Sequence, residues 1–172
     1  LLKDVKYEEV SIEDISMIYA SIEEENMEII ILEKAPKIAV YSPPGQQPWD
    51  DAVTLALTYA DIKYDVIFDD EVMNGELYKY DWLHLHHEDF TGQYGKFLRY
   101  KNQEWYKNMK TDFENTAENY GFKTVHKFKK TIALKIREYI NNGGFLFAMC
   151  SATDSFDIAL SYYLIDFAHE VY

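Results

Sequence analysis

The chain has 172 residues, 48% of them hydrophobic, which is enough for one sizeable core. Thirty acidic residues against seventeen basic ones give a net charge of -13, which argues against a nucleic-acid-binding surface. No apolar run approaches the roughly 18 residues of a membrane span, and the chain as given opens with no signal peptide, so we expect a soluble protein of the cytoplasm or periplasm.

The first part of the chain predicts helix and then strand. Helix-start patterns, a hydroxyl followed three residues later by an acid, begin at Ser11 and again at Ser21. A β-branched run covers residues 28–32, and a second helix is expected from Asp50 or Asp51 through Ala60. Between them, a strand leads into a loop that holds three of the four prolines.

Apolar runs predict four buried strands, at residues 37–41, 64–68, 80–86 and 145–149. The helix between the first two makes a β-α-β unit, which predicts a parallel, doubly wound sheet. Two more helices are expected at 102–120 and 127–140, with Gly121 and Gly143 closing them. The second carries a lysine cluster, expected to be a solvated face, at Lys123, Lys127, Lys129 and Lys130.

We expect one α/β domain over residues 1–172, with its core at 37–160 and a helical and strand segment at 1–36 that the pattern does not place. The sequence starts without Met and stops soon after the last strand and its turn. We therefore expect a processed chain or an incomplete domain.

The single cysteine, Cys150, stands between the last strand and a predicted helix. That position exposes a thiol at the carboxyl edge of the sheet, where the positive end of the helix favours thiolate. The backbone N–H of Ser151 is then placed to bind an oxyanion, and the small neighbours Ala148 and Ala152 suit a tight turn. The alternative is a buried structural cysteine.

Five potential ligands or proton carriers follow the third strand, namely His84, His86, His87, Glu88 and Asp89. Strand alternation places His84 and His86 on one face and His87 on the other, if the strand extends that far. The group allows a catalytic or substrate-binding histidine, a metal site of His84, His86 and Asp89, or histidines that only satisfy hydrogen bonds. We expect no cofactor and, in the leading interpretation, no metal.

The loops after the first and third strands are expected to meet at the sheet's carboxyl edge and to contact a small molecule. Gly45 and Gly92 are candidate backbone contacts in these loops. Three aromatic residues flank the loops as candidate pocket walls, Trp49, Phe90 and Tyr94.

The order of these parts resembles the class I glutamine amidotransferase-like superfamily over residues 37–160. Its nucleophile motif, Gly/Ala-x-Cys-x-Gly/Ala, is matched by residues 148–152, so the resemblance gives Cys150 the nucleophile role. It implies a flavodoxin-like three-layer sandwich with a mostly parallel sheet, a nucleophile elbow, and oxyanion-hole amides in residues 87–95. Segments 39–43, 47–52, 81–95 and 147–154 look most like a bacterial family named asparagine synthetase B.

Class I glutaminases carry a His-x-Glu pair far downstream of the cysteine, whereas here only His169 and Glu170 follow it. The triad is incomplete in this respect, and we expect His86 or His87 to take the histidine's place because the third strand neighbours the first at the switch point.

Three functions follow from these patterns. The leading one is an amide or acyl hydrolase that uses Cys150, the Ser151 and Gly92 amides, and His86 or His87, with Glu88 beside them. The second is a non-catalytic domain that binds a small polar ligand through a rim of Trp49, His86, Glu88 and Tyr94. The third is a metal-assisted hydrolase. In each case the partner is a small molecule, and the sequence also allows a homo-oligomer.

Overall fold

The computed structural model describes residues 11–25, 35–44, 52–92 and 95–165. The chain divides into two compact units, Leu1–Ala35 and Pro36–Tyr172. The predicted strand at 28–32 and the predicted helix start at Asp50 or Asp51 lie outside the described residues. None of the described helices combines the length and apolar character needed to cross a membrane.

The first unit contains helix α1, Ile12–Glu24. Its start at Ser11 is confirmed, because the Ser11 hydroxyl accepts the Asp14 N–H at 3.2 Å and the Asp14 carboxylate accepts the Ser11 N–H at 3.3 Å. The predicted second start at Ser21 is wrong. Helix α1 runs through that position, where the Ser21 carbonyl accepts the N–H of Glu25 at 3.1 Å.

The second unit is built on a four-stranded, all-parallel sheet, as predicted. The strands are β1 (Ile38–Tyr41), β2 (Tyr64–Ile67), β3 (Trp82–Leu85) and β4 (Phe145–Ala148), in the order β2-β1-β3-β4. Register is set by the pairs Val40 with Val66, Val40 with His84, and His84 with Phe147. This order is compatible with a flavodoxin-like sandwich.

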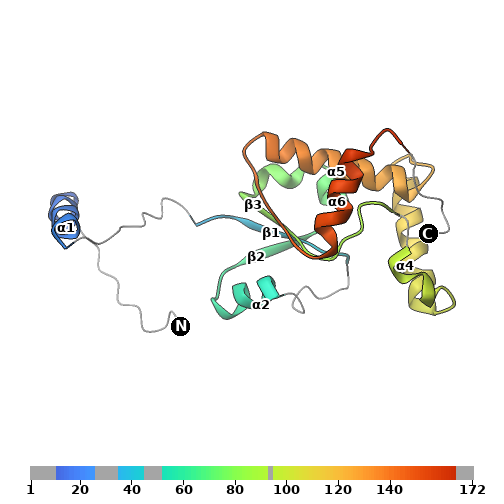
Figure 1. The fold of residues 1–172 in the computed structure, drawn as a ribbon, viewed down its shortest axis with the longest axis horizontal. Helices are drawn as coiled ribbons and strands as arrows, with labels where there is room; N and C mark the ends of the chain where they lie inside the picture. The colour runs from blue at the N-terminus through green and yellow to red at the C-terminus, as the bar shows by residue number, and fades with distance from the viewer. Residues whose placement is uncertain (1–10, 26–34, 45–51, 93–94, 166–172) are drawn as a thin grey trace. The chain divides into compact units, whose positions relative to one another are not determined.

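Helices lie on both sides of this sheet (Figure 1). On one side are α3 (Asp69–Met73), α5 (Val125–Asn141) and α6 (Ser151–Ser161), and on the other is α2 (Ala52–Tyr59). The main core forms where the first group meets strand residues that face it, including Leu83 and Leu85 of β3 with Ile132 and Ile136 of α5, all fully buried. Parallel strands need such cover on both faces.

The remaining helical segments among the described residues are α4 (Glu104–Asn119) and the short 3-10 helices η2 (Glu76–Lys79) and η3 (Gly95–Tyr100). The predicted ends of α4 and α5 are confirmed, since Gly121 and Gly143 take φ of 79° and 98° just after them. Helix α5 begins two residues before its predicted start because the Thr124 hydroxyl caps it by accepting the Lys127 N–H at 3.3 Å.

Strand β4 is less buried than its apolar sequence predicts. Phe145 and Phe147 are 58% and 39% exposed, whereas Leu146 and Ala148 on the opposite face pack against the core. Among the described strands, β4 pairs only with β3, so it lies at the edge of the described sheet, where fewer neighbours cover its outer face. An apolar sequence predicts a buried strand, but it does not show how many other strands and helices cover that strand.

The lysine cluster on α5 is not a uniformly solvated face, and that prediction is wrong for Lys129 and Lys130. The Lys129 side chain is only 5% exposed, and its Nζ lies 2.7 and 2.8 Å from the two carboxylate oxygens of Asp69 on α3. It also donates to the Tyr41 hydroxyl at 3.1 Å. Lys130 donates to the carbonyl of Ile165 at 2.7 Å. A buried ammonium is tolerated here because a carboxylate pairs with it.

Replacing Lys129 by Met should leave the Asp69 carboxylate buried without its cation. We expect the free energy of unfolding to fall by about 3–5 kcal/mol in urea denaturation. The matched control is Lys110→Met, which removes an exposed pair with Glu114 (3.6 Å) and should change stability by less than about 0.5 kcal/mol. Equal losses in the two variants would contradict a structural role for the buried pair.

Candidate active site

The carboxyl ends of β1 and β3 lie side by side, because the chain leaves β1 toward β2 on one flank and reaches β3 on the other. Crevices at such switch points are where open parallel sheets bind ligands. Here Pro43 follows β1 and residues 86–92 follow β3, and both segments line one pocket. The structure therefore confirms that these two loops meet.

Cys150 forms the turn between β4 and α6. Its φ and ψ are 51° and -138°, which make it one of two described non-glycine residues with positive φ, the other being Asp61. The turn is fixed from both sides, since the Met149 N–H donates to the carbonyl of Leu85 at 3.0 Å and the Thr153 N–H donates to the carbonyl of Cys150 at 3.2 Å. Cys150 is exposed. The alternative of a buried structural cysteine is therefore wrong.

The first turns of α6 hold the loop after β3 in place. The carbonyl groups of residues 86–88 accept hydrogen bonds from, in order, the Ala152 N–H at 3.2 Å, the Ser151 hydroxyl at 3.1 Å and the Ser155 hydroxyl at 2.7 Å. Three consecutive carbonyls are thus bound to one helix end. Because Cys150 immediately precedes that helix, the same contacts fix the loop relative to the thiol.

This anchoring brings His86, His87 and Cys150 together. Their ligand atoms, one ring nitrogen of each histidine and the sulfur, all lie within 4.8 Å of one another. The placement of His87 on the opposite strand face required the strand to reach that residue, and it does not apply, because β3 ends at Leu85 and the chain then bends where the His86 N–H donates to Oε2 of Glu88 at 2.7 Å. The two imidazole centroids are 3.5 Å apart.

His84 and Asp89, the other candidate metal ligands, take different positions. His84 is fully buried within the sheet, where its ring stacks on Phe147 at 5.6 Å between centroids. The Asp89 carboxylate accepts the Thr91 N–H at 2.9 Å, so it shapes its own loop. The structure groups His86 with His87 and Cys150 and does not bring it together with His84 and Asp89 as a set of ligands.

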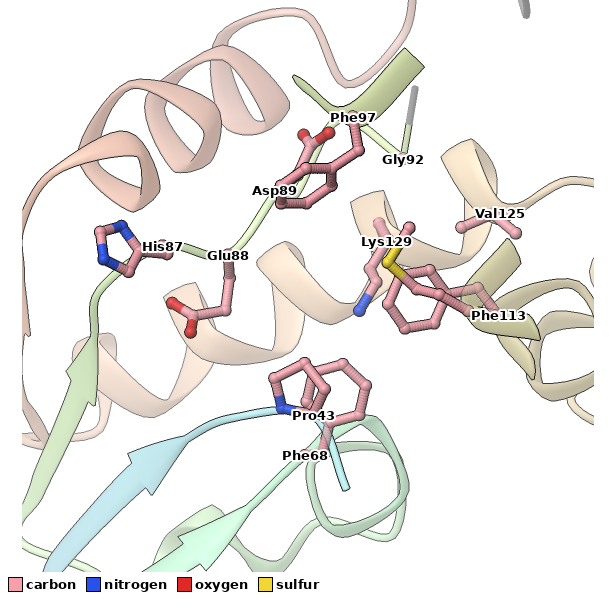
Figure 2. A pocket seen from close by; sticks show the side chains of 11 residues that line it. Pro43, Phe68, His87, Glu88, Asp89, Gly92, Phe97, Phe113, Val125 and Lys129 are labelled. Atoms are coloured by element: carbon pink, nitrogen blue, oxygen red, sulfur yellow. The ribbon is translucent and has the colours of Figure 1, made fainter. Parts of the chain in front are cut away.

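The pocket beside His87 has a volume of about 120 Å³ and a mostly apolar wall. Figure 2 shows His87, Glu88 and Asp89 along one side, with Lys129 and Phe113 across from them and Pro43 and Phe68 below. The remaining described lining residues are Gly92, Phe97, Met109 and Val125.

Some of the predicted pocket contacts are elsewhere or are not described. Phe90 is fully buried in the core between Tyr41 and Phe156, with centroid distances of 5.5 and 5.4 Å, so it is not a pocket wall. Gly45, Trp49 and Tyr94 lie outside the described residues. The aromatic walls that the structure shows are Phe68, Phe97 and Phe113, which lie outside the two loops from which pocket walls were predicted.

The cation of the pocket is Lys129, the only lysine or arginine among its described lining residues. Its Nζ lies 4.3 Å from the ring centroid of Phe68 and 5.0 Å from that of Phe113, and it is bound to Asp69 as described above. Burial, together with the adjacent Asp69 carboxylate, raises the pKa of Tyr41 well above its usual value. Tyr41 therefore stays protonated and donates to Asp69.

Gly92 is fixed against the start of α5. Its φ is +65°, and a Cβ built on it would lie 2.7 Å from the His126 Cα. The adjacent Thr91 carbonyl is 2.7 Å from Nδ1 of His126. Gly92 lines the pocket with His87, but no described contact joins it to Cys150, so its part in an oxyanion hole stays a prediction.

Sequence reasoning missed Ser155 and the group formed by Tyr41, Asp69 and Lys129. Ser151 and Ser155 stand four residues apart, which puts both hydroxyls on one helix face, and this spacing was the available signal. The pairing of Asp69 with Lys129 spans 60 residues, and no local pattern marks it.

In comparisons with known proteins, no family model, no curated protein and no solved structure matches this chain.

Replacing Gly92 by Ala should destabilise the loop after β3. The matched control is Gly75→Ala, since Gly75 also has positive φ (+77°) but nothing within 4 Å of a new Cβ. The control should cost about 1–2 kcal/mol from backbone strain alone, and Gly92→Ala should cost clearly more because the His126 backbone must move. Thermal unfolding of the two variants tests this, and similar losses would contradict the close approach.

Proposed function

We propose that this protein is a cysteine-dependent hydrolase of small amides or esters, of the class I glutamine amidotransferase-like type. The observation that carries the proposal is the convergence of the Cys150 sulfur with the imidazoles of His86 and His87, within 4.8 Å, at the carboxyl edge of a parallel sheet. A nucleophile and a base in one group, supplied by different segments of the fold, are what acyl transfer requires.

Cys150 is the proposed nucleophile. Backbone strain of the kind seen at φ 51° and ψ -138° is concentrated at functional sites, and a sharp strand-to-helix turn is the geometry of a nucleophile elbow. The sulfur attacks the substrate carbonyl carbon and the thiol proton passes to an imidazole. The oxyanion then forms near the start of α6, where the Ser151 amide and the positive end of the helix favour negative charge.

His87 is the proposed proton carrier, because it lines the pocket as well as standing beside the sulfur. Its separation from the thiol is within reach of one bridging water, and such contacts tighten when substrate binds. The protonated imidazole then gives its proton to the leaving amine or alcohol. In the second half of the reaction it takes a proton from the water that hydrolyses the thioester. Glu88 acts indirectly, since its carboxylate holds the bend at His86.

The pocket limits the substrate class. Its volume of about 120 Å³ suits a group about the size of one aromatic ring, and its walls are mostly apolar. The Lys129 ammonium is already bound to Asp69, and two acidic residues, Glu88 and Asp89, also line the pocket. A neutral apolar acyl group therefore fits better than the zwitterion glutamine, which needs a cation for its α-carboxylate.

A second candidate function is non-catalytic binding of a small ligand. It is favoured by one observation, that the described lining of the pocket includes His87 but not Cys150. A ligand held there without reaction with the thiol would indicate this alternative.

Turnover of 4-nitrophenyl phenylacetate tests the proposal. We expect hydrolysis with a transient thioester on Cys150, detected by mass spectrometry, and faster turnover than with L-glutamine. Cys150→Ala should lower kcat/KM by at least about 10³-fold and His87→Ala by about 10²- to 10⁴-fold. The control Ser161→Ala, at the far end of α6, should keep full activity.

Full turnover in Cys150→Ala would show that Cys150 is not the nucleophile. Saturable binding of phenylacetate without any thioester or turnover in the parent chain would favour the binding alternative.

Met109→Ala should widen the pocket and change its size preference. Removal of this side chain should raise kcat/KM for a naphthylacetyl ester relative to a phenylacetyl ester by about 10-fold or more. The control Met73→Ala removes the same side chain from α3, outside the described pocket lining, and should leave the ratio unchanged. An unchanged ratio in Met109→Ala would show that acyl groups bind elsewhere.

A further inference from the structure

We propose that His86, His87 and Cys150 also form a three-ligand site for a thiophilic divalent cation, for which Zn²⁺ is the best match. The inference rests on the convergence of the three side chains and does not require the proposed hydrolase activity. Among the part of the chain that the structure describes, this is the one group of three or more Cys, His, Asp or Glu side chains whose ligand atoms converge in this way.

The donor set selects the class of metal. One thiolate and two imidazoles are soft or borderline ligands, which suit zinc and disfavour the hard ions Mg²⁺ and Ca²⁺. Three protein ligands with a fourth position left to water are the arrangement of open zinc sites. Zinc also imposes little geometric preference of its own, so an irregular site on a loop is acceptable to it.

The distances are compatible with closure around one ion. Zinc bonds of about 2.3 Å to sulfur and about 2.1 Å to nitrogen place tetrahedral ligands roughly 3.4–3.6 Å apart. The present atoms lie within 4.8 Å of one another, so each pair must close by at most about 1.4 Å. His87 and Cys150 are exposed and His86 is half-buried, so side-chain rotation can supply this movement.

The backbone around the ligands is already fixed. The hydrogen bonds from Ala152, Ser151 and Ser155 to the carbonyls of residues 86–88 tie the histidine segment to the helix that follows the cysteine. Binding of a metal between the two segments therefore costs little conformational entropy, which favours a high affinity for the metal.

Metal binding would compete with thiol chemistry. On binding, the Cys150 thiol loses its proton to solvent, its sulfur forms a bond to zinc, and both imidazoles donate neutral lone pairs. Coordination to zinc withdraws electron density from the sulfur and lowers its nucleophilicity toward a carbonyl or an alkylating reagent. The metal would thus act as a reversible block on the thiol.

Zn²⁺ titration of the metal-free full chain, in competition with a chromophoric chelator, tests the site. We expect one equivalent to bind, and Co²⁺ in its place to show sulfur-to-cobalt charge-transfer absorption. Cys150→Ser and His87→Ala should each weaken binding by more than about 10-fold, the range seen when even indirect ligand partners are lost. The matched control His126→Gln changes a histidine outside the group and should bind as the parent does.

A second measurement uses the unmodified chain alone. Zn²⁺ should slow alkylation of Cys150 by iodoacetamide at least about 10-fold, Mg²⁺ should not, and a chelator should restore the rate. Equal zinc affinity in Cys150→Ser, or an unchanged alkylation rate at saturating Zn²⁺, would overturn the inference. If Zn²⁺ slows alkylation of Cys150 but the chain hydrolyses no ester, the proposed hydrolase is rejected and the metal site is supported. If the chain hydrolyses the ester but Zn²⁺ does not slow alkylation, only the metal site is rejected.

Discussion

The attachment of the loop after β3 to the first turns of α6 is the constraint on which the rest of the site depends. Three successive carbonyls are bound by one backbone amide and two hydroxyls, at 3.2, 3.1 and 2.7 Å. Each such hydrogen bond has a modest net contribution of about 1 kcal/mol, but together they attach the loop to α6 at three successive residues. Without them, no local feature of the sequence would keep two histidines beside the only cysteine.

Most parts of the fold that depend on short sequence patterns were predicted correctly. Apolar runs located all four strands, the single β-α-β spacing indicated a parallel sheet, and Ser11, Gly121 and Gly143 marked helix ends correctly. Prediction failed where a neighbour distant in the chain decides the outcome. The exposure of Phe145 depends on the position of β4 at the edge of the described sheet, and the burial of Lys129 depends on Asp69, 60 residues away.

The same distinction applies to the site. The positions of Cys150 at a strand-to-helix turn and of a histidine segment at the neighbouring strand end were predictable, because parallel strands share a carboxyl edge. The convergence of both histidines on the sulfur was not predictable, because it depends on the chain bend at His86 and on hydrogen bonds to α6, a helix more than 60 residues away. The pocket walls from α4 and η3 also escaped prediction, since helix packing and not sequence distance brings Phe97 and Phe113 to the loops.

The left-handed backbone at Cys150 also bears on how this position can change over evolutionary time. A residue with a side chain is held there at a cost of the order of 1–3 kcal/mol, which glycine would largely avoid. A lineage that had no use for the sulfur would gain stability by drifting to glycine, and β-branched residues would be excluded throughout. If relatives keep cysteine at this position, the thiol itself is therefore under selection, because the fold alone would favour glycine there.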